Sequence, residues 1–113
     1  MKTFTFSPSR IAALLALGLA TTAQAAWPDK PVTLVVPYSA GGPTDVVARV
    51  LAVPMGQSLG QTVVVENTVG AGGTIAPARV AKARNDGYTI LIHHMGMATA
   101  PALYKKLPYN PLT

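Results

Sequence analysis

Three short runs of this 113-residue chain are rich in β-branched and other apolar residues, and each run is followed by a polar or glycine-containing segment. The runs are residues 32–36 (VTLVV), 62–66 (TVVVE) and 88–92 (YTILI). A short run without polar alternation is typical of a strand buried on both faces, as in a parallel sheet. We therefore predict three buried strands joined by helical connections.

The segment after the first run predicts a helix from about residue 44 to residue 59. Thr44 can serve as its N-cap, and Asp45 lies in the first turn, where negative charge is favoured. Pro54 predicts a kink or an early break, because an interior proline removes a backbone hydrogen bond, and Gly60 predicts the helix end. The apolar stripe expected to face the sheet comprises Val47, Val50, Leu51, Met55 and Leu59.

Two further helices are expected, from about residue 74 to 84 and from about residue 100 to 104. The resulting order is strand, helix, strand, helix, strand, helix, and the connections are long enough for parallel pairing. Crossovers of this kind are right-handed. The pattern therefore predicts an α/β fold, a three-layer sandwich around a mostly parallel sheet.

Three loops, at residues 38–44, 67–73 and 93–98, would leave the carboxyl edge of that sheet, where open α/β folds bind their ligands. The first two contain paired glycines and then a helix start. Glycine allows the backbone to approach a ligand closely, and the free N–H groups of a first helical turn favour an anion. We expect these amides to bind a carboxylate without a charged side chain.

Composition and motifs exclude several classes of function. The absence of Cys excludes disulfides, Cys-ligated zinc and iron–sulfur clusters. The net charge is +5, but the basic residues are spread out apart from a short cluster at residues 79–84, and no aromatic side chains alternate with that cluster, so no nucleic-acid partner is expected. Residues 70–75 resemble a dinucleotide fingerprint but end in Ile75, so no cofactor is expected. Neighbouring His93 and His94 would point to opposite faces of a strand, which argues against a metal site.

Residues 1–25 have the order of a secretory signal peptide. Lys2 and Arg10 are basic, residues 11–20 (IAALLALGLA) are apolar, and residues 23–25 (AQA) form a small-residue cleavage site. The apolar run is about half of the ~20 residues that span a bilayer. We expect export to the periplasm, cleavage before Ala26 and no membrane-spanning segment afterwards.

Several motifs between residues 27 and 109 carry a family resemblance. They are WPDKPV (27–32), VVPY (35–38), GGPTD (41–45), VVVEN (63–67), GAGG (70–73), DGYT (86–89) and LYKKLPY (103–109). In this order and spacing the chain resembles the receptors of tripartite tricarboxylate transporters, the Bug (TctC) family of periplasmic solute-binding proteins.

The resemblance implies a Venus-flytrap binding protein with two domains, without catalytic activity, that captures a small organic carboxylate and delivers it to membrane permease subunits. Because members have two domains of roughly 100–150 residues each, residues 26–113 would form a partial first lobe. Asp45 would support the first loop. Carried over position by position, the ligand-binding residues are Tyr38, Ser39, Ala40, Gly41, Gly42, Thr44, Ala71, Gly72, Gly73, Thr74, His94 and Gly96.

The third loop departs from the small polar loop usual in the family, because residues 93–97 read HHMGM. This change suits an aromatic or less polar acid. The expected function is a periplasmic carboxylate receptor, truncated after part of its first domain. Two alternatives stay open: a small exported α/β hydrolase or isomerase that uses His93 or His94, and a degenerate product or interaction module that pairs with a separately encoded second half. The enzyme alternative lacks a nucleophile beside a base.

Overall fold

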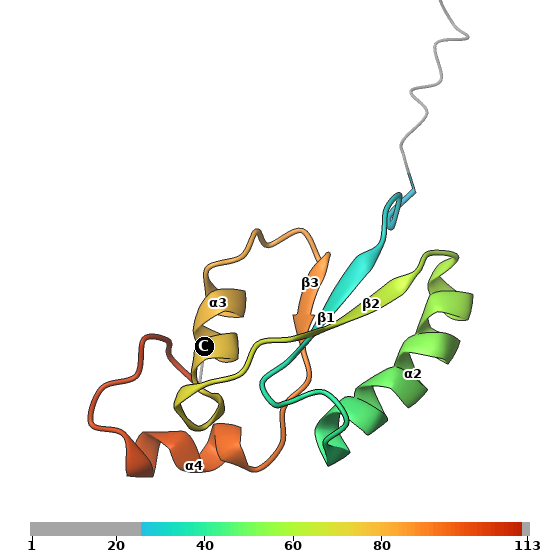
Figure 1. The fold of residues 1–113 in the computed structure, drawn as a ribbon. Coiled ribbons are helices and arrows are strands. Elements are labelled where there is room, and N and C mark those ends of the chain that lie inside the picture. Colours follow the sequence, from blue (N-terminus) through green and yellow to red (C-terminus); the bar gives the residue numbers. More distant parts are fainter. Residues whose placement is uncertain (1–25, 112–113) are drawn as a thin grey trace, which may run out of the picture.

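The computed structural model describes residues 26–111, which form an α/β fold (Figure 1). Strand β1 (Val32–Val36) is followed by helix α2 (Pro43–Leu59) and strand β2 (Val63–Asn67). The 3-10 turn η2 (Ala71–Gly73) and helix α3 (Ile75–Ala81) come next, and strand β3 (Thr89–Leu91) and helix α4 (Gly96–Leu103) complete the order. The expected signal peptide lies outside the described residues.

The three strands form one parallel sheet in the order β2-β1-β3. In its register Val32 pairs with Val63 on one side of β1, and Thr33 pairs with Thr89 on the other. Helix α2 packs against β1 and β2 and helix α3 against β1 and β3, on opposite faces of the sheet (Figure 1). The predicted three-layer architecture with a parallel sheet is confirmed.

The core is centred on β1 and the inner face of α2. Val32, Leu34 and Val36 are buried there with Ala48 and Val63. Fully burying a Val or Leu side chain stabilises a fold by about 1.5–3 kcal/mol. Only β1 is buried along nearly all of its length; β2 is buried only at its first residue, and β3 is half-buried. The prediction of three fully buried strands is therefore wrong for β2 and β3, which lie at the two edges of the described sheet.

Helix α2 turns a different face to the sheet from the one that its apolar pattern predicts. Asp45 and Ala48 are buried, and Ala52, Met55 and Leu59 pack against the core. Of the predicted stripe, only Met55 and Leu59 are among these, whereas Val47, Val50 and Leu51 are 51%, 67% and 42% exposed. Both faces of this helix carry apolar residues, so periodicity alone does not select the buried face.

The first helix also differs from expectation at its start and at Pro54. It begins at Pro43 with Gly42 as N-cap, so Thr44 is inside the helix and makes no capping bond. Proline is suited to the first helical position because its φ angle is already close to the helical value. The helix continues past Pro54 to Leu59, so it does not break early, and a kink at Pro54 stays a prediction. Gly60 ends the helix in the left-handed conformation, as predicted.

The other boundaries shift by a few residues. Strand β2 lies one residue later than predicted, β3 is shorter, and α3 ends at Ala81 rather than at residue 84. Helix α4 begins at Gly96, so the second half of the predicted third loop is helical. No helix among the described residues is long and apolar enough to cross a membrane.

Candidate functional site

Tyr38, two residues after β1, brings the three loops at the carboxyl edge of the sheet together. Its ring stacks on His94, with centroids 4.6 Å apart and an interplanar angle of 8°, and meets the ring of His93 edge-on at 5.7 Å. A Cβ atom at Gly73 would lie 3.0 Å from the Tyr38 hydroxyl oxygen, and one at Gly96 would lie 2.9 Å from it. Residues of the second and third loops therefore touch one side chain of the first loop, and glycine at positions 73 and 96 allows the close approach.

The loop after β1 is held by a buried carboxylate. Asp45, 2% exposed, accepts hydrogen bonds from the Gly41 amide at 2.8 Å, from Arg49 Nε at 2.9 Å and from Asn67 Nδ2 at 2.9 Å. Asn67 Nδ2 also donates to the Tyr38 carbonyl at 2.9 Å. The bond from Arg49, with those from Gly41 and Asn67, lowers the pKa of Asp45 below its ordinary value. Asp45 thus stays ionised and fixes the loop, the supporting role that the family resemblance implies.

The loop after β2 is held by its own turns and by a second tyrosine. The Gly73 amide donates to the Gly70 carbonyl at 2.9 Å, and the Thr74 hydroxyl donates to the Ala71 carbonyl at 2.9 Å. Tyr104, just after α4, donates its hydroxyl proton to the same Ala71 carbonyl at 3.3 Å. The segment after α4 therefore lies against this loop.

The expectation of unpaired amides is wrong for part of both glycine loops. The Gly41 amide is bound to Asp45, the Gly42 amide donates to the Ser39 carbonyl at 3.2 Å, and the Gly73 amide is bound within its own turn. The amides of Ser39 and Ala40 have no acceptor among residues 26–111, and both residues are exposed. Within the same range the amides of Ala71 and Gly72, which are also exposed, have no acceptor either, so the donors left for a ligand come from residues 39–40 of the first loop and 71–72 of the second.

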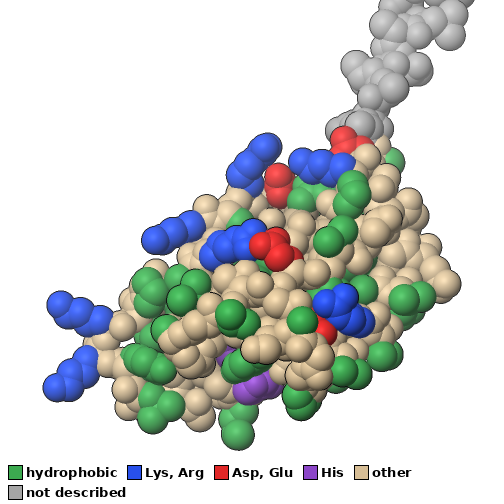
Figure 2. All heavy atoms as spheres, viewed as in Figure 1, with side chains coloured by type: hydrophobic (Ala, Val, Ile, Leu, Met, Phe, Trp, Pro, Cys, Tyr) green, Lys and Arg blue, Asp and Glu red, His purple; other side chains and the backbone are tan. Residues whose placement is uncertain are grey.

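His93 and His94 lie beyond the end of β3, and their ring centroids are 5.5 Å apart. The expectation that they point to opposite faces is wrong, because side chains alternate only within a strand. In the part of the chain that the structure describes, no three metal-ligating side chains are grouped. The rings instead join the aromatic cluster on Tyr38, among hydrophobic side chains at the lower edge of the molecule in Figure 2.

Two cavities adjoin His94 at this edge. One, of about 280 Å³, is lined by Pro43, Thr44, Val47, Ile92, His93 and His94. It lies between the start of α2 and the end of β3. The strand order reverses about β1, and doubly wound folds bind ligands at such a switch point. The other, of about 340 Å³, is lined by His94, Met95, Met97, Ala98, Pro101 and Pro111.

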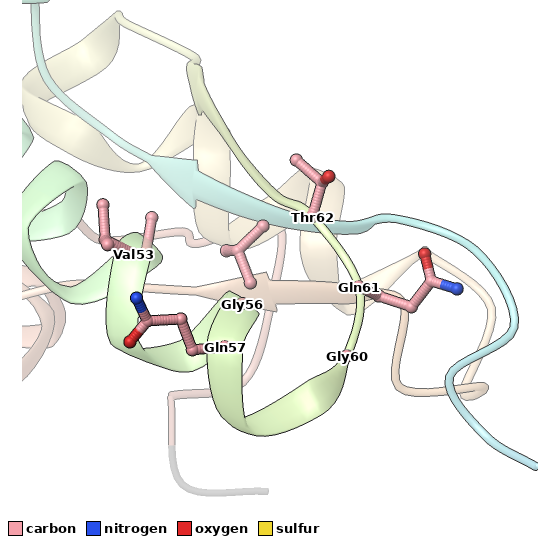
Figure 3. Close-up of a pocket in the computed structure, with 8 residues that line it drawn as sticks. Val53, Gly56, Gln57, Gly60, Gln61 and Thr62 are labelled. Carbon is pink, nitrogen blue, oxygen red and sulfur yellow. The ribbon is translucent and has the colours of Figure 1, made fainter.

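A larger hollow of about 490 Å³ lies at the opposite, amino edge of the sheet (Figure 3). Val53 and Gln57 of α2 and Gln61 and Thr62 before β2 line it. It is far along the strands from the three loops, because β2 begins at its rim. The carboxyl edge, with its aromatic cluster and available amides, is the candidate site.

The residues expected to bind ligand divide by exposure. Ser39, Ala40, Gly41, Ala71, Gly72 and His94 are exposed, and Tyr38, Gly42, Thr44 and Gly96 are half-buried. Gly73 and Thr74 are buried, so they lie beneath the exposed residues of the second loop.

Sequence reasoning missed Asn67, Arg49 and Tyr104. Arg49 follows Asp45 by four residues on a helix, a spacing at which side chains meet, so this contact had a detectable signal. The contacts of Asn67 and Tyr104 span 22 and 33 residues, and no local pattern indicates them.

Comparison with known proteins places the chain in a family. The family model described as "Tripartite tricarboxylate transporter family receptor" matches residues 47–113, more than half of the chain. A protein of Agrobacterium vitis, described as "UPF0065 protein in the TAR-I ttuE-ttuC' intergenic region", is 53% identical over 90 residues. That match covers 80% of this chain and 26% of the relative, so the chain spans about a quarter of the relative's length.

Solved structures agree in fold. The periplasmic binding protein BugD superposes with a TM-score of 0.75 at 59% identity, over 77% of this chain and 29% of BugD. MatC from Rhodopseudomonas palustris, solved with bound malate, superposes with a TM-score of 0.73 at 48% identity, over 75% of this chain and 29% of MatC. The α/β lobe described above is thus the fold of part of a periplasmic binding protein, and the chain belongs to the tripartite tricarboxylate transporter receptor family.

Proposed function

We propose that this chain forms part of the first lobe of a periplasmic receptor that binds a small organic carboxylate and delivers it to the membrane permease of a tripartite transporter. The observation that carries the proposal is the meeting of three loops on Tyr38 at the carboxyl edge of the sheet, beside available amides and a cavity. The malate bound to MatC supports a carboxylate as ligand.

In this role the residues from Tyr38 to Thr44 and from Ala71 to Thr74 would form one wall of the site, with His94 and Gly96 beside them. The Ser39 and Ala40 amides would donate to a carboxylate, and each charge-assisted hydrogen bond contributes about 1.5–3 kcal/mol. Asp45 would hold the first loop in shape without touching ligand. The role is binding alone; no residue of the proposed site performs a reaction step, and no cofactor or metal takes part.

The second wall would come from a further domain, as in two-domain solute-binding proteins of this family. Closure of the two domains would then bury the ligand, and the closed form would be recognised by the permease. A chain confined to one lobe would bind ligand weakly, because it buries only one side of it.

A thermal-shift measurement of the full chain with malate tests carboxylate binding, and the neutral diamide of malate is the matched control. Ligand that binds only the folded state raises the unfolding midpoint by mass action. We expect malate, and not the diamide, to raise it. A shift with neither compound, or an equal shift with both, would argue against a carboxylate site.

The expected export rests on residues 1–25 and has its own test. Periplasmic extraction of an expressing bacterium, followed by N-terminal sequencing, should give a chain that begins at Ala26. Recovery of an uncut chain only in the cytoplasm would contradict the proposed location.

A further inference from the structure

His93 uses both of its ring nitrogens within the protein. Its Nδ1 accepts the His94 amide proton at 2.8 Å, and its Nε2 lies 3.3 Å from the Gly73 carbonyl oxygen. The His94 carbonyl is farther from Nδ1, at 3.2 Å, so the shorter contact to the amide decides the assignment. A nitrogen that accepts a hydrogen bond carries no proton, so neutral His93 is protonated on Nε2 and donates to Gly73. His93 thereby links the third loop to the second through a hydrogen bond.

His94 keeps one ring nitrogen available. Its Nδ1 accepts the Gly96 amide proton at 3.2 Å, which places the proton of the neutral ring on Nε2. Within residues 26–111 this Nε2 has no hydrogen-bond partner, and the residue is exposed. The stack on Tyr38 fixes the plane of the ring. His94 also lines both cavities at this edge.

The residues that line these two cavities carry no other titratable charge. Apart from His93 and His94 they are apolar, except for Thr44. The titratable groups that face the His94 ring are His93, on its own segment, and Tyr38, from the loop after β1. Burial, with a smaller effect from Tyr109, raises the pKa of Tyr38, so this phenol stays neutral at ordinary pH. Protonation of His94 would therefore add positive charge to an otherwise neutral, mostly apolar wall.

We propose that His94 Nε2 is the side-chain donor for a ligand carboxylate, and that protonation of His94 tightens ligand capture as the pH falls. This inference rests on the proposed function and deepens it. Histidine ordinarily changes its charge between pH 5 and 8, and a charged donor forms a stronger bond to a carboxylate than a neutral one. The second proton goes to Nδ1, so the hydrogen bond from the Gly96 amide is lost on protonation, while the ring remains stacked on Tyr38 because a cation is attracted to the face of an aromatic ring. The ligand class is a small acid whose apolar body fits the cavity beside Pro43 and Ile92.

The test compares binding of malate and of benzoate to the full chain at pH 6 and pH 8, by titration followed with NMR. We expect both acids to bind about tenfold more tightly at pH 6, as a charge-assisted bond replaces a neutral one. His94→Gln keeps an N–H donor but cannot gain charge, so its affinity should be equal at the two pH values. The neutral diamide of malate is the matched control, and its binding to the unaltered chain should not tighten at pH 6.

Imidazole ¹⁵N spectra of the ligand-free protein provide a readout independent of affinity. They should show both neutral rings protonated on Nε2, and of the two rings only that of His94 should change its signals when malate is added. A pH dependence that persists in His94→Gln, or a neutral His94 protonated on Nδ1, overturns the proposal. The same holds if malate shifts the Ser39 and Ala40 amides and leaves His94 unmoved, although the carboxylate function then stands. If neither acid shifts any of these signals at either pH, the proposed function itself fails, and this inference fails with it.

Discussion

The two glycine loops reach the same edge of the sheet but are held in place by different means. The loop after β1 is fixed by a buried ionised side chain, Asp45, which binds the Gly41 amide. The loop after β2 is fixed by backbone turns and by tyrosine rings, because Gly73 packs against Tyr38 and Ala71 accepts from Tyr104. One loop therefore depends on charge and the other on shape.

Each of the two loops contains a glycine in the left-handed conformation, but the two glycines are required for different reasons. Gly41 has a φ angle of 81° and Gly73 one of 88°, so both adopt a conformation that costs other residues about 1–2 kcal/mol. No neighbouring atom lies within 4 Å of a Cβ atom placed on Gly41, whereas a Cβ atom placed on Gly73 would lie 3.0 Å from the Tyr38 hydroxyl oxygen. Position 41 therefore requires glycine only because of its left-handed backbone conformation. Position 73 requires glycine for that reason and also because a Cβ atom would be too close to Tyr38.

The largest expected effect comes from breaking the charged support of the first loop. Asp45→Asn removes the negative charge and leaves the Gly41 amide and the Arg49 and Asn67 donors without a full acceptor. An unpaired buried polar group is costly, so the midpoint of thermal unfolding should fall further than in single substitutions of the second loop. Arg49→Ala, which removes the more exposed partner, is the control and should lower the midpoint less. Equal midpoints for the two variants would contradict the central role of Asp45.

A methyl group added at Gly73 should destabilise the second loop. Gly73→Ala should lower the free energy of unfolding by about 2–4 kcal/mol, because it combines backbone strain with overpacking against Tyr38. Gly41→Ala, with the same kind of φ angle and open space, should cost only about 1–2 kcal/mol. Chemical denaturation of the pair measures the difference. If both variants lose the same free energy, Tyr38 does not constrain the second loop.

Acid should weaken the support that Asp45 gives to the first loop. The pKa of Asp45 is lowered by its bonds to Arg49, Gly41 and Asn67, so the unfolded state binds its proton more readily. Its contribution to stability is complete above the ordinary Asp pKa of about 3.9 and is lost as the pH falls below it. Unfolding followed from pH 6 to pH 2 should therefore show a steep fall in the wild type. The fall should be shallower in Asp45→Asn, and identical slopes would exclude Asp45 as its source.

The smallest effect is expected at an exposed ion pair beside the second loop. Arg79 donates through both terminal nitrogens to Glu66, and these side chains are 47% and 42% exposed. The bonds lower the pKa of Glu66, but solvent screens such a pair. Arg79→Lys should change the free energy of unfolding by about 0.5 kcal/mol or less, and added salt should reduce even that. A loss as large as that of Gly73→Ala would show that this pair, and not shape, supports the loop.

Much of the architecture could be predicted because its signals are local. The run VTLVV marks β1 to the residue, Gly60 marks the end of α2, and the order of elements requires a parallel sheet. The meeting of three loops at one edge follows from parallel strands as well. The buried face of α2 could not be predicted, because Val50 and Leu51 are as apolar as the residues that pack against the sheet.

By itself the sequence determined the α/β order, the edge at which the loops lie and the family motifs, since each depends on residues close together in the chain. Tertiary structure alone decided which amides stay available. Asp45 and Asn67 meet across 22 residues and Tyr104 reaches Ala71 across 33, and pairings at such separations leave no periodic signal. It also decided the different roles of His93 and His94: in sequence they are identical neighbours, and only their hydrogen bonds to Gly73 and Gly96 distinguish them.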